Sequence, residues 1–185
     1  MSKIALITGA TAGIGRATAL KLAENGWSVI ITGRRSERLE SVKEAIEKNY
    51  SVQAYILSFD IRDKHEVFNS IDSLPDEWKN IQILVNNAGL AAGLSHIQDG
   101  EIDDWERMID TNVKGLLYIT RKIAPRMIEQ GSGHILNVAS IAGHEVYEKG
   151  NVYCASKHAV EALSKAMRID MLKDKIKVTN ISPGM

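Results

Sequence analysis

The fold is decided by Thr8-Gly9-Ala10-Thr11-Ala12-Gly13-Ile14-Gly15, a glycine-rich turn near the N-terminus. The turn follows Lys3–Thr8, an almost wholly apolar segment that predicts a strand covered on both faces. It leads into Ile14–Asn25, whose pattern predicts a helix closed by Gly26. Glycines permit a tight turn and a close backbone approach, and a helix N-terminus offers free N–H groups with a partial positive charge. A strand, a glycine turn and a helix in this order predict a pyrophosphate-binding site.

Outward from this turn, short β-branched segments alternate with longer amphipathic ones. Six strands alternating with helices predict a Rossmann-like, doubly wound α/β fold, in which a parallel sheet carries helices on both faces. No internal repeat or linker interrupts the pattern, so we expect a single dinucleotide-binding and catalytic domain over residues 1–185. The predicted strands are Lys3–Thr8, Trp27–Thr32, Val52–Phe59, Ile81–Asn86, His134–Ala139 and Lys177–Ile181, and the predicted helices are Ile14–Asn25, Ser36–Asn49, Asp63–Leu74, Asp103–Gln130 with a break near Asn112, and Val152–Lys173.

The composition argues against several classes of protein. Lysine plus arginine number 23, as do aspartate plus glutamate, which argues against nucleic acid or an anionic membrane as the main partner. The apolar run Ile4–Ile7 is too short for a signal-peptide core, and no run approaches the roughly 18 residues of a membrane helix. The single cysteine, Cys154, cannot form an internal disulfide and indicates a cytoplasmic protein. The five histidines show no metal-ligand spacing, so we expect no metal site.

The second predicted strand runs into Thr32-Gly33-Arg34-Arg35. A site for NAD usually places an acidic residue here to hold the ribose 2′-hydroxyl, and this stretch has none. Guanidinium groups bind phosphate with paired donors, and NADP carries a 2′-phosphate at this point. We therefore expect NADP, with Arg34 as the phosphate ligand and Arg35 as a second ligand. The alternative for one of the two is the start of a solvated helix face.

The last predicted helix opens with Tyr153-Cys154-Ala155-Ser156-Lys157. Positions i and i+4 share one helix face, so Tyr153 and Lys157 are neighbours. A nearby ammonium group favours the phenolate, which makes Tyr153 a candidate general acid and base. Ser140 ends the fifth predicted strand, where its hydroxyl can stabilise charge on a substrate carbonyl oxygen. The alternative for Ser140 is a local turn bond.

Taken together, these features occur in a characteristic order: the G-x-x-x-G-x-G turn, Asn86-Asn87-Ala88-Gly89, a helical Asn112, Ser140, Tyr-x-x-x-Lys and Pro183-Gly184. With these motifs in this order, the sequence resembles the short-chain dehydrogenase/reductase family. The resemblance implies hydride transfer between NADP(H) and a hydroxyl or carbonyl substrate. It also implies that a seventh strand and a substrate-covering region normally follow the Pro-Gly turn. Because the sequence stops at Met185, we expect a C-terminally truncated chain with six strands and without the usual seventh.

The same resemblance implies roles for individual residues. Tyr153 is the implied proton donor, Lys157 binds the nicotinamide ribose and favours the phenolate, and Ser140 orients the carbonyl. Asn112 is the implied anchor of a water relay to Lys157. Asp60 is implied to contact the adenine amino group, although an aspartate in a turn is an equal alternative, and Asn86 is expected to be structural. The full set of expected cofactor contacts is Gly9, Thr11, Ala12, Gly13, Ile14, Gly15, Arg34, Arg35, Asp60, Ile61, Asn87, Ala88, Gly89, Tyr153, Lys157, Pro183 and Gly184.

Four shorter stretches narrow the resemblance. They are Gly33–Leu39, Leu74–Trp78, Asn86–Ala91 and Gly150–Tyr153, and they resemble the NADP-dependent 3-hydroxy acid dehydrogenases, which act on serine, allo-threonine or malonic semialdehyde. The alternatives are a reductase for a 3-ketoacyl thioester, a sugar or an alcohol, and a non-catalytic NADP-binding fragment. The expected partners are a small-molecule substrate and a second copy of the chain, since two long helices, Trp105–Arg126 and Val152–Met171, are suited to a homodimer, with a homotetramer as the alternative.

Overall fold

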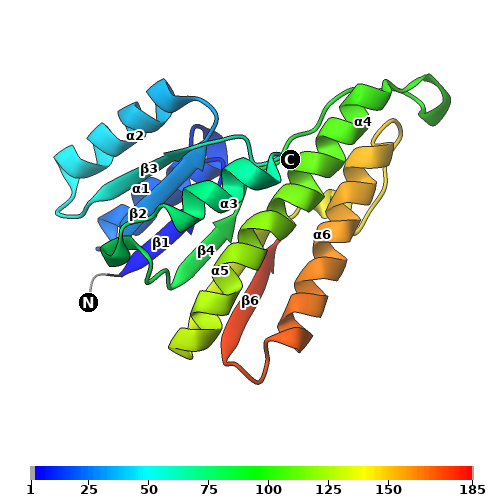
Figure 1. Ribbon diagram of the computed structural model, residues 1–185. Coiled ribbons are helices and arrows are strands. Elements are labelled where there is room, and N and C mark those ends of the chain that lie inside the picture. The colour runs from blue at the N-terminus through cyan, green and yellow to red at the C-terminus, as the bar shows by residue number, and fades with distance from the viewer. Residues whose placement is uncertain (1–2, 185) are drawn as a thin grey trace.

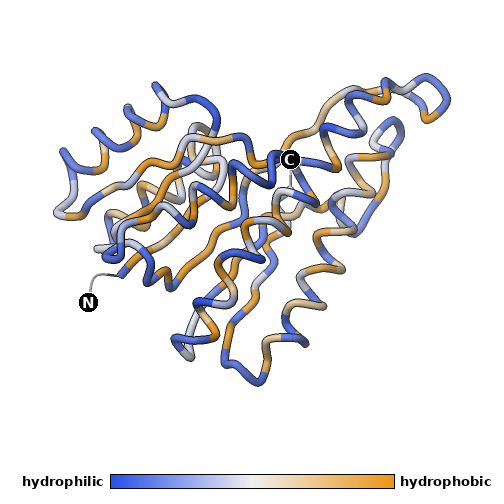
Figure 2. The backbone as a smooth tube through the Cα atoms, in the orientation of Figure 1, coloured by the Kyte–Doolittle hydropathy of each residue, from blue (hydrophilic) through white to orange (hydrophobic). Residues whose placement is uncertain are grey.

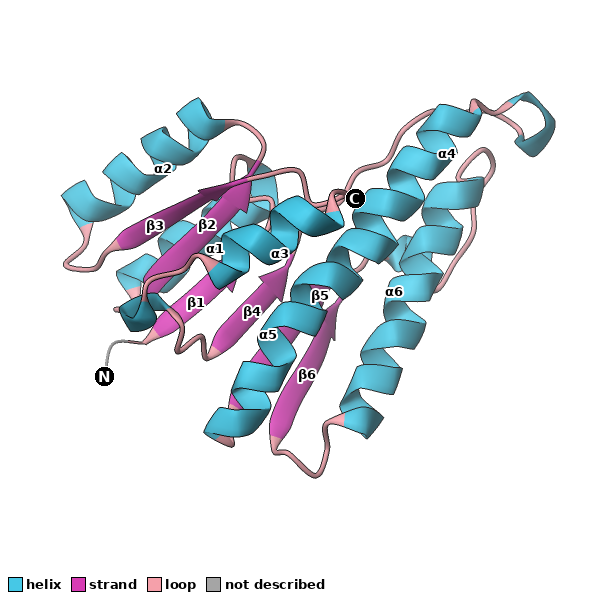
Figure 3. Cartoon of the chain, viewed as in Figure 1, coloured by secondary structure: helices cyan, strands magenta, loops and turns pink. Residues whose placement is uncertain are grey.

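The computed structural model describes residues 3–184, so residues 1, 2 and 185 of the predicted domain lie outside the described part. The described part of the chain contains one sheet of six parallel strands, in the order β3-β2-β1-β4-β5-β6 (Figure 3). The prediction of a six-stranded, doubly wound sheet is confirmed, and the strand order reverses direction between β1 and β4. The strands are β1 (Ile4–Ile7), β2 (Ser28–Gly33), β3 (Ala54–Ser58), β4 (Ile83–Asn86), β5 (Gly133–Val138) and β6 (Ile176–Ile181).

Helices cover both faces of the sheet. α1 (Gly13–Glu24) and α2 (Ser36–Asn49) pack on one face, and their apolar residues form one core with the strands. α3 (Lys64–Asp72), α5 (Leu116–Gln130) and α6 (Asn151–Asp170) pack on the other face around a second core, as Figure 1 shows. α4 (Ile102–Ile109) leads into α5.

The first strand shows why the two cores require near-continuous apolar runs. Ile4 and Leu6 point into the core of α3, α5 and α6, whereas Ala5 and Ile7 point into the core of α1 and α2. All four side chains are at most 2% exposed. Burying each large aliphatic side chain stabilises the fold by roughly 1.5–3 kcal/mol. The apolar colour along the strands in Figure 2 reflects this burial on both faces.

The predicted helix Asp103–Gln130 is interrupted where a break was expected. α4 ends at Ile109, a π-helical turn spans Asp110–Gly115, and α5 then runs to Gln130. Such π turns leave the helical ladder locally irregular and are frequent at functional sites. The turn lies beside the carboxyl ends of the strands and brings Asn112 into the interior, where it is 2% exposed.

Most element boundaries agree with the prediction within two residues, and α6 is the main exception. It ends at Asp170 rather than Lys173, because the chain turns through Met171 and Lys175, and Lys175 has a positive φ of 60°. Among residues 3–184, no helix has both the length and the apolar character needed to cross a membrane. In the same part of the chain, no three potential metal-ligating side chains of His, Cys, Asp or Glu come together.

Candidate active site

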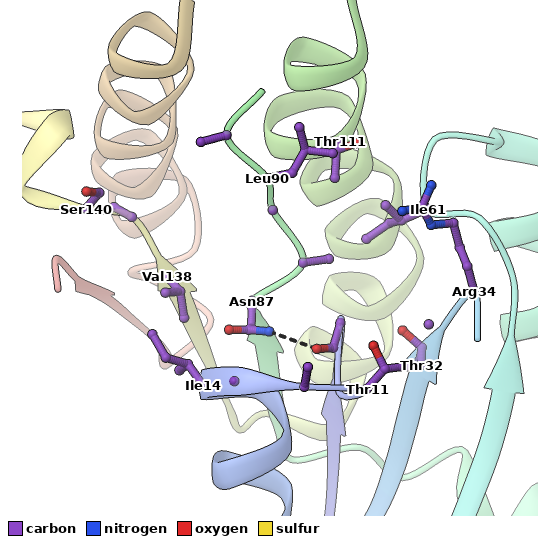
Figure 4. A pocket seen from close by; sticks show the side chains of 18 of the residues that line it. Thr11, Ile14, Thr32, Arg34, Ile61, Asn87, Leu90, Thr111, Val138 and Ser140 are labelled. Atoms are coloured by element: carbon purple, nitrogen blue, oxygen red, sulfur yellow. Dashed lines mark hydrogen bonds between the residues drawn. The ribbon is translucent and has the colours of Figure 1, made fainter. Parts of the chain in front are cut away.

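A pocket of about 550 Å³ lies at the carboxyl ends of the strands, above the point where the strand order reverses. In open α/β sheets this is where ligands bind. Figure 4 shows Ser140 and Val138 on the opposite side of the pocket from Arg34 and Ile61, with Asn87 between them. The lining residues that were expected from the sequence are Gly9, Thr11, Ala12, Gly13, Ile14, Arg34, Arg35, Asp60, Ile61, Asn87, Ala88, Gly89, Ser140, Tyr153, Lys157, Pro183 and Gly184.

The floor of the pocket is made by the turns that follow β1 and β4. Gly9 has a φ of +67°, and a Cβ there would lie 2.9 Å from the Cα of Ala88, so only glycine fits this position. The Asn87 amide donates to the carbonyl oxygen of Thr8 at 2.9 Å. The Thr8 hydroxyl in turn accepts from the backbone N–H groups of Asn87 and Ala88. These bonds fix the two turns against each other.

The N-terminus of α1 opens into the pocket. Its N-cap residue, Ala12, makes no side-chain capping bond, so the first N–H groups of the helix are free for a ligand. Gly13 has a φ of +53°, and a Cβ there would meet nothing within 4 Å, which leaves open space beside the helix end. A 12-residue helix with an open first turn is suited to hold an anion, so these residues fit a dinucleotide pyrophosphate.

Gly15 does not line the pocket, and its expected contact with the cofactor stays a prediction. It is buried, and a Cβ at this position would overlap the Asn87 amide nitrogen and the Gly9 carbonyl oxygen. Its place is beneath the turn, where the lack of a side chain allows α1 to approach β1 and β4 closely. Gly15 is therefore a packing glycine and not a wall residue.

On the β2 and β3 side, Arg34 and Arg35 are exposed, and Arg34 pairs with the partly buried Asp60. Arg34 Nη1 lies 3.7 Å from Asp60 Oδ2, with the Arg34 side chain 58% exposed. The Arg35 guanidinium donates to the Thr11 hydroxyl at 2.6 Å. Both arginines thus lie at the mouth of the pocket, where their remaining donors can reach a phosphate.

The Asp60 carboxylate is held mainly by Arg62, which donates to both of its oxygens at 2.6–3.1 Å. Partial burial by itself would raise the pKa of Asp60, but the Arg62 hydrogen bonds and the charges of Arg62 and Arg34 outweigh it, so the pKa lies below its ordinary value. Asp60 lines the pocket, yet its carboxylate already has strong partners. The expected contact of Asp60 with adenine stays a prediction.

Tyr153 and Lys157 lie on the opposite side, on the first turns of α6. The Lys157 ammonium is 5.8 Å from the centre of the Tyr153 ring and donates to the Val138 carbonyl oxygen at 2.9 Å. Lys157 is only 6% exposed, and burial lowers its pKa to about 8. The side chain is therefore mainly charged at neutral pH, and its charge faces the pocket beside the phenol.

Ser140 lines the same side of the pocket and caps a short 3₁₀ helix, Ile141–Gly143. Its hydroxyl oxygen accepts from the Ala142 N–H at 3.2 Å. The local turn bond that the sequence allowed is therefore present. Because the hydroxyl acts as acceptor in this bond, its proton can still be donated into the pocket.

Asn112 supports the pocket from behind and does not line it. Its side-chain oxygen accepts from the Leu90 N–H at 2.8 Å, and its amide donates to the Leu90 carbonyl at 2.9 Å and to Ser156 Oγ at 3.0 Å. The Asn112 side chain thus fixes the wall residue Leu90 to α6. Its role as anchor of a water relay to Lys157 stays a prediction.

Several wall residues were not assigned to the site from the sequence. Thr32, Phe59, Val138 and Ala139 lie at or just beyond the ends of β2, β3 and β5. Their signal in the sequence is their place at the carboxyl ends of predicted strands, where ligands bind in open α/β sheets. Asn86, in contrast, is buried and donates to Thr120 and Asn137, as expected of a structural residue. The other unassigned wall residues are Gly33, Leu90, Ala91 and Thr111.

The glycine turn, the carboxyl-end pocket and the Tyr-x-x-x-Lys helix together define a nucleotide-dependent oxidoreductase. The model of the short chain dehydrogenase family matches residues 3–185, and the chain belongs to this family.

Individual relatives are closely similar. The chain is 46% identical over 182 residues to the NADP-dependent 3-hydroxy acid dehydrogenase YdfG of Escherichia coli O6:H1, covering 98% of this chain and 72% of the relative. It is 44% identical over 186 residues to sulfoacetaldehyde reductase 2 of Chromohalobacter salexigens, covering 100% and 73%. Among solved structures, the closed form of serine dehydrogenase complexed with NADP+ aligns with a TM-score of 0.94 at 44% identity, covering 98% of this chain and 72% of that one.

Proposed function

We propose that this protein transfers a hydride between NADP(H) and the CH–OH carbon of a 3-hydroxy acid, or in reverse to the corresponding carbonyl. The observation that carries the proposal is that Tyr153 and Lys157 line the same pocket as the glycine turn at the start of α1. A pocket that only bound nucleotide would not need a phenol beside a buried ammonium group. We take residues 1–185 as one domain that holds both the cofactor and the catalytic residues.

In this proposal the cofactor lies along the carboxyl ends of the strands. The open N-terminus of α1, with Gly13 and Ile14, holds the pyrophosphate. Arg34 and Arg35 bind the 2′-phosphate, for which exposed guanidinium groups are well suited. Pro183 and Gly184, which line the pocket, would hold the nicotinamide end. The similarity to the NADP-dependent 3-hydroxy acid dehydrogenase YdfG and to serine dehydrogenase complexed with NADP+ supports this choice of nucleotide. The remaining proposed cofactor contacts are Gly9, Thr11, Ala12, Asp60, Ile61, Asn87, Ala88, Gly89, Tyr153 and Lys157.

NADPH, when bound, supplies the hydride, and the protein contributes orientation and proton transfer. Tyr153 donates a proton to the carbonyl oxygen in the reducing direction and removes it in the oxidising direction. Lys157, charged beside the phenol, favours the phenolate and binds the nicotinamide ribose. Ser140 donates a hydrogen bond to the same carbonyl oxygen and stabilises its developing negative charge.

A second candidate substrate is the aldehyde of a sulfonate. The identity to sulfoacetaldehyde reductase 2, 44%, is close to the identity to the 3-hydroxy acid dehydrogenase, 46%. Both substrate types carry an anionic group near a carbonyl or hydroxyl carbon. A reductase for a ketoacyl thioester, a sugar or an alcohol is the broader alternative.

The proposal is tested by following NADPH absorbance with a panel of substrates. We expect turnover with 3-hydroxy acids such as serine and 3-hydroxypropionate, and with malonic semialdehyde in reverse. Sulfoacetaldehyde is included as the competing substrate. Turnover of sulfoacetaldehyde alone would replace the 3-hydroxy acid assignment, and tight NADPH binding without turnover of any substrate would favour a binding protein.

We also propose that the protein is a homodimer in the cytoplasm, with a tetramer as the alternative. Exposed apolar side chains on the helices support a dimer: Leu117 and Ile128 on α5, and Ile169 on α6. The buried free thiol of Cys154 suits a reducing compartment. Analytical ultracentrifugation at micromolar concentration tests the assembly, and a single monomeric species would contradict it.

A further inference from the structure

The Glu161 carboxylate, which the proposed reaction does not use, is buried on α6 one turn beyond Lys157. The residue is 8% exposed. A buried carboxylate is stable only when donors surround it. One of its oxygens, Oε1, accepts from Ser182 Oγ at 2.8 Å and from the Asn180 side-chain amide, and it lies 2.9 Å from His144 Nε2. Three donors from two other segments therefore converge on this single atom.

Each of these donors belongs to a segment that forms the catalytic side of the pocket. His144 follows the 3₁₀ helix that Ser140 caps, and Ser182 directly precedes Pro183 and Gly184. The two segments also contact each other, because the Ile141 N–H donates to the Pro183 carbonyl oxygen at 3.0 Å. Glu161 is thus the point at which α6 holds both segments.

Residues 140–144, the Ser140 segment, approach α6 so closely that position 143 must be a glycine. A Cβ on Gly143 would lie 2.9 Å from the Lys157 carbonyl oxygen and 3.0 Å from Glu161 Cγ. Behind this contact, Asn180 accepts from Ser164, which fixes the orientation of the amide that donates to Glu161. The carboxylate therefore belongs to a connected set of hydrogen bonds, in which loss of one member frees the others.

We propose that Glu161 is a positioning residue: its carboxylate holds the Ser140 segment and the Ser182–Gly184 segment against the face of α6 that carries Tyr153 and Lys157. This inference rests on the proposed function, since it concerns the same pocket. It assigns to Glu161 no contact with substrate or cofactor. Its effect reaches the chemistry through Ser140 and the Pro183–Gly184 turn, and it leaves the β2 and β3 side unchanged.

The first test is hydrogen exchange on the nucleotide-free protein, which does not depend on activity. In Glu161→Gln and Glu161→Ala we expect faster exchange in peptides covering residues 140–144, while peptides covering the glycine turn, residues 9–16, keep the wild-type rate. Glu145→Gln is the matched control, because Glu145 is an exposed carboxylate on the same segment, beside His144. Unchanged exchange at residues 140–144, or equal acceleration in both peptides, would overturn the proposal.

The second test separates binding from turnover. In Glu161→Gln we expect kcat to fall by roughly 10- to 100-fold, because small misplacements of catalytic groups are costly, while the NADPH Kd stays within about twofold of the wild-type value. Combining Glu161→Gln with Ser182→Ala should cost no more than Glu161→Gln alone, since Ser182 acts through the same carboxylate. A kcat equal to that of Glu145→Gln, or fully additive losses, would contradict the proposal. If the wild type binds NADPH but turns over no substrate, the proposed function fails, and the exchange experiment still decides the role of Glu161.

Discussion

The two sides of the pocket are built in opposite ways. On the β2 and β3 side, Arg34 is 58% exposed and pairs with the partly buried Asp60 across 3.7 Å, so the arginine charge lies in solvent. On the α6 side, Lys157 is 6% exposed and Glu161 8%, and both are held by hydrogen bonds. Exposed ion pairs contribute little to stability, whereas buried polar groups are costly to disturb. We therefore expect the proposed recognition of the 2′-phosphate to be separable from the stability of the fold, and the proposed proton transfer to depend on it.

The largest expected effect comes from the phenol. Tyr153→Phe should lower kcat by roughly 10²–10⁴-fold, because it removes the proton donor and acceptor. The NADPH Kd and the melting temperature should remain near wild type, since the substitution removes only the hydroxyl and keeps the ring. Steady-state kinetics together with a nucleotide titration check this, and a variant with unchanged turnover would refute the proposed mechanism.

The next largest effect is expected for Arg34, on the exposed side of the pocket. Arg34→Ala should weaken NADPH binding by roughly 10- to 100-fold, the loss expected for a charged hydrogen bond to phosphate. NADH binding and the melting temperature should not change. Fluorescence titrations with both nucleotides measure this. Arg38→Ala serves as control, because Arg38 is an exposed arginine of α2 that does not line the pocket; equal effects of the two substitutions would contradict the assignment of Arg34.

Substitution of Lys157 measures how much the buried charge on the α6 side of the pocket destabilises the fold. Lowering its pKa from the ordinary 10.5 to about 8 costs the folded, charged state about 3 kcal/mol at pH 7. Removing the amine also removes the bond to Val138, worth about 1 kcal/mol. Lys157→Met should be inactive, because it lacks the ammonium group that favours the phenolate and binds the nicotinamide ribose. The difference between the two energies predicts that its nucleotide-free form is more stable than wild type by about 2 kcal/mol.

The extra stability of Lys157→Met should decrease as the pH rises. The cost of the buried charge is present in full below pH 8, where both the folded and unfolded chains hold the proton. Between about pH 8 and 10.5 only the unfolded chain holds it, so wild-type stability rises with pH in this window. The advantage of Lys157→Met should shrink over the same window. Urea unfolding at pH 7 and pH 10 measures this, and an advantage that does not change with pH would contradict it.

The smallest expected effect concerns the orientation of Arg35. Thr11→Val removes the hydroxyl that accepts from Arg35, and NADPH binding should weaken by about 2- to 10-fold, as expected for one neutral acceptor. Binding of NADH should stay the same. A loss of affinity for both nucleotides alike would indicate that Thr11 acts on the pyrophosphate turn and not through Arg35.

The sequence predicted the strands because each of them is an apolar run buried on both faces, a local signal that Lys3–Thr8 already carries. It also predicted the side chains that meet through helical spacing, such as Tyr153 and Lys157. The sequence could not predict which motif residues line the pocket. Gly15 and Asn112 occupy motif positions but lie behind the lining residues, because only the packed structure decides which neighbours cover them. The set of Glu161, His144 and Ser182 was missed because these three residues meet only through tertiary packing.

The most direct test of this account is a double-mutant cycle between the two sides, with kcat/KM for NADPH measured in wild type, Arg34→Ala, Tyr153→Phe and the double variant. If nucleotide recognition and proton transfer are separable, the two losses add in free energy to within about 0.5 kcal/mol. A larger coupling, with the double variant no worse than Tyr153→Phe alone, would contradict the division of the pocket into a binding side and a catalytic side.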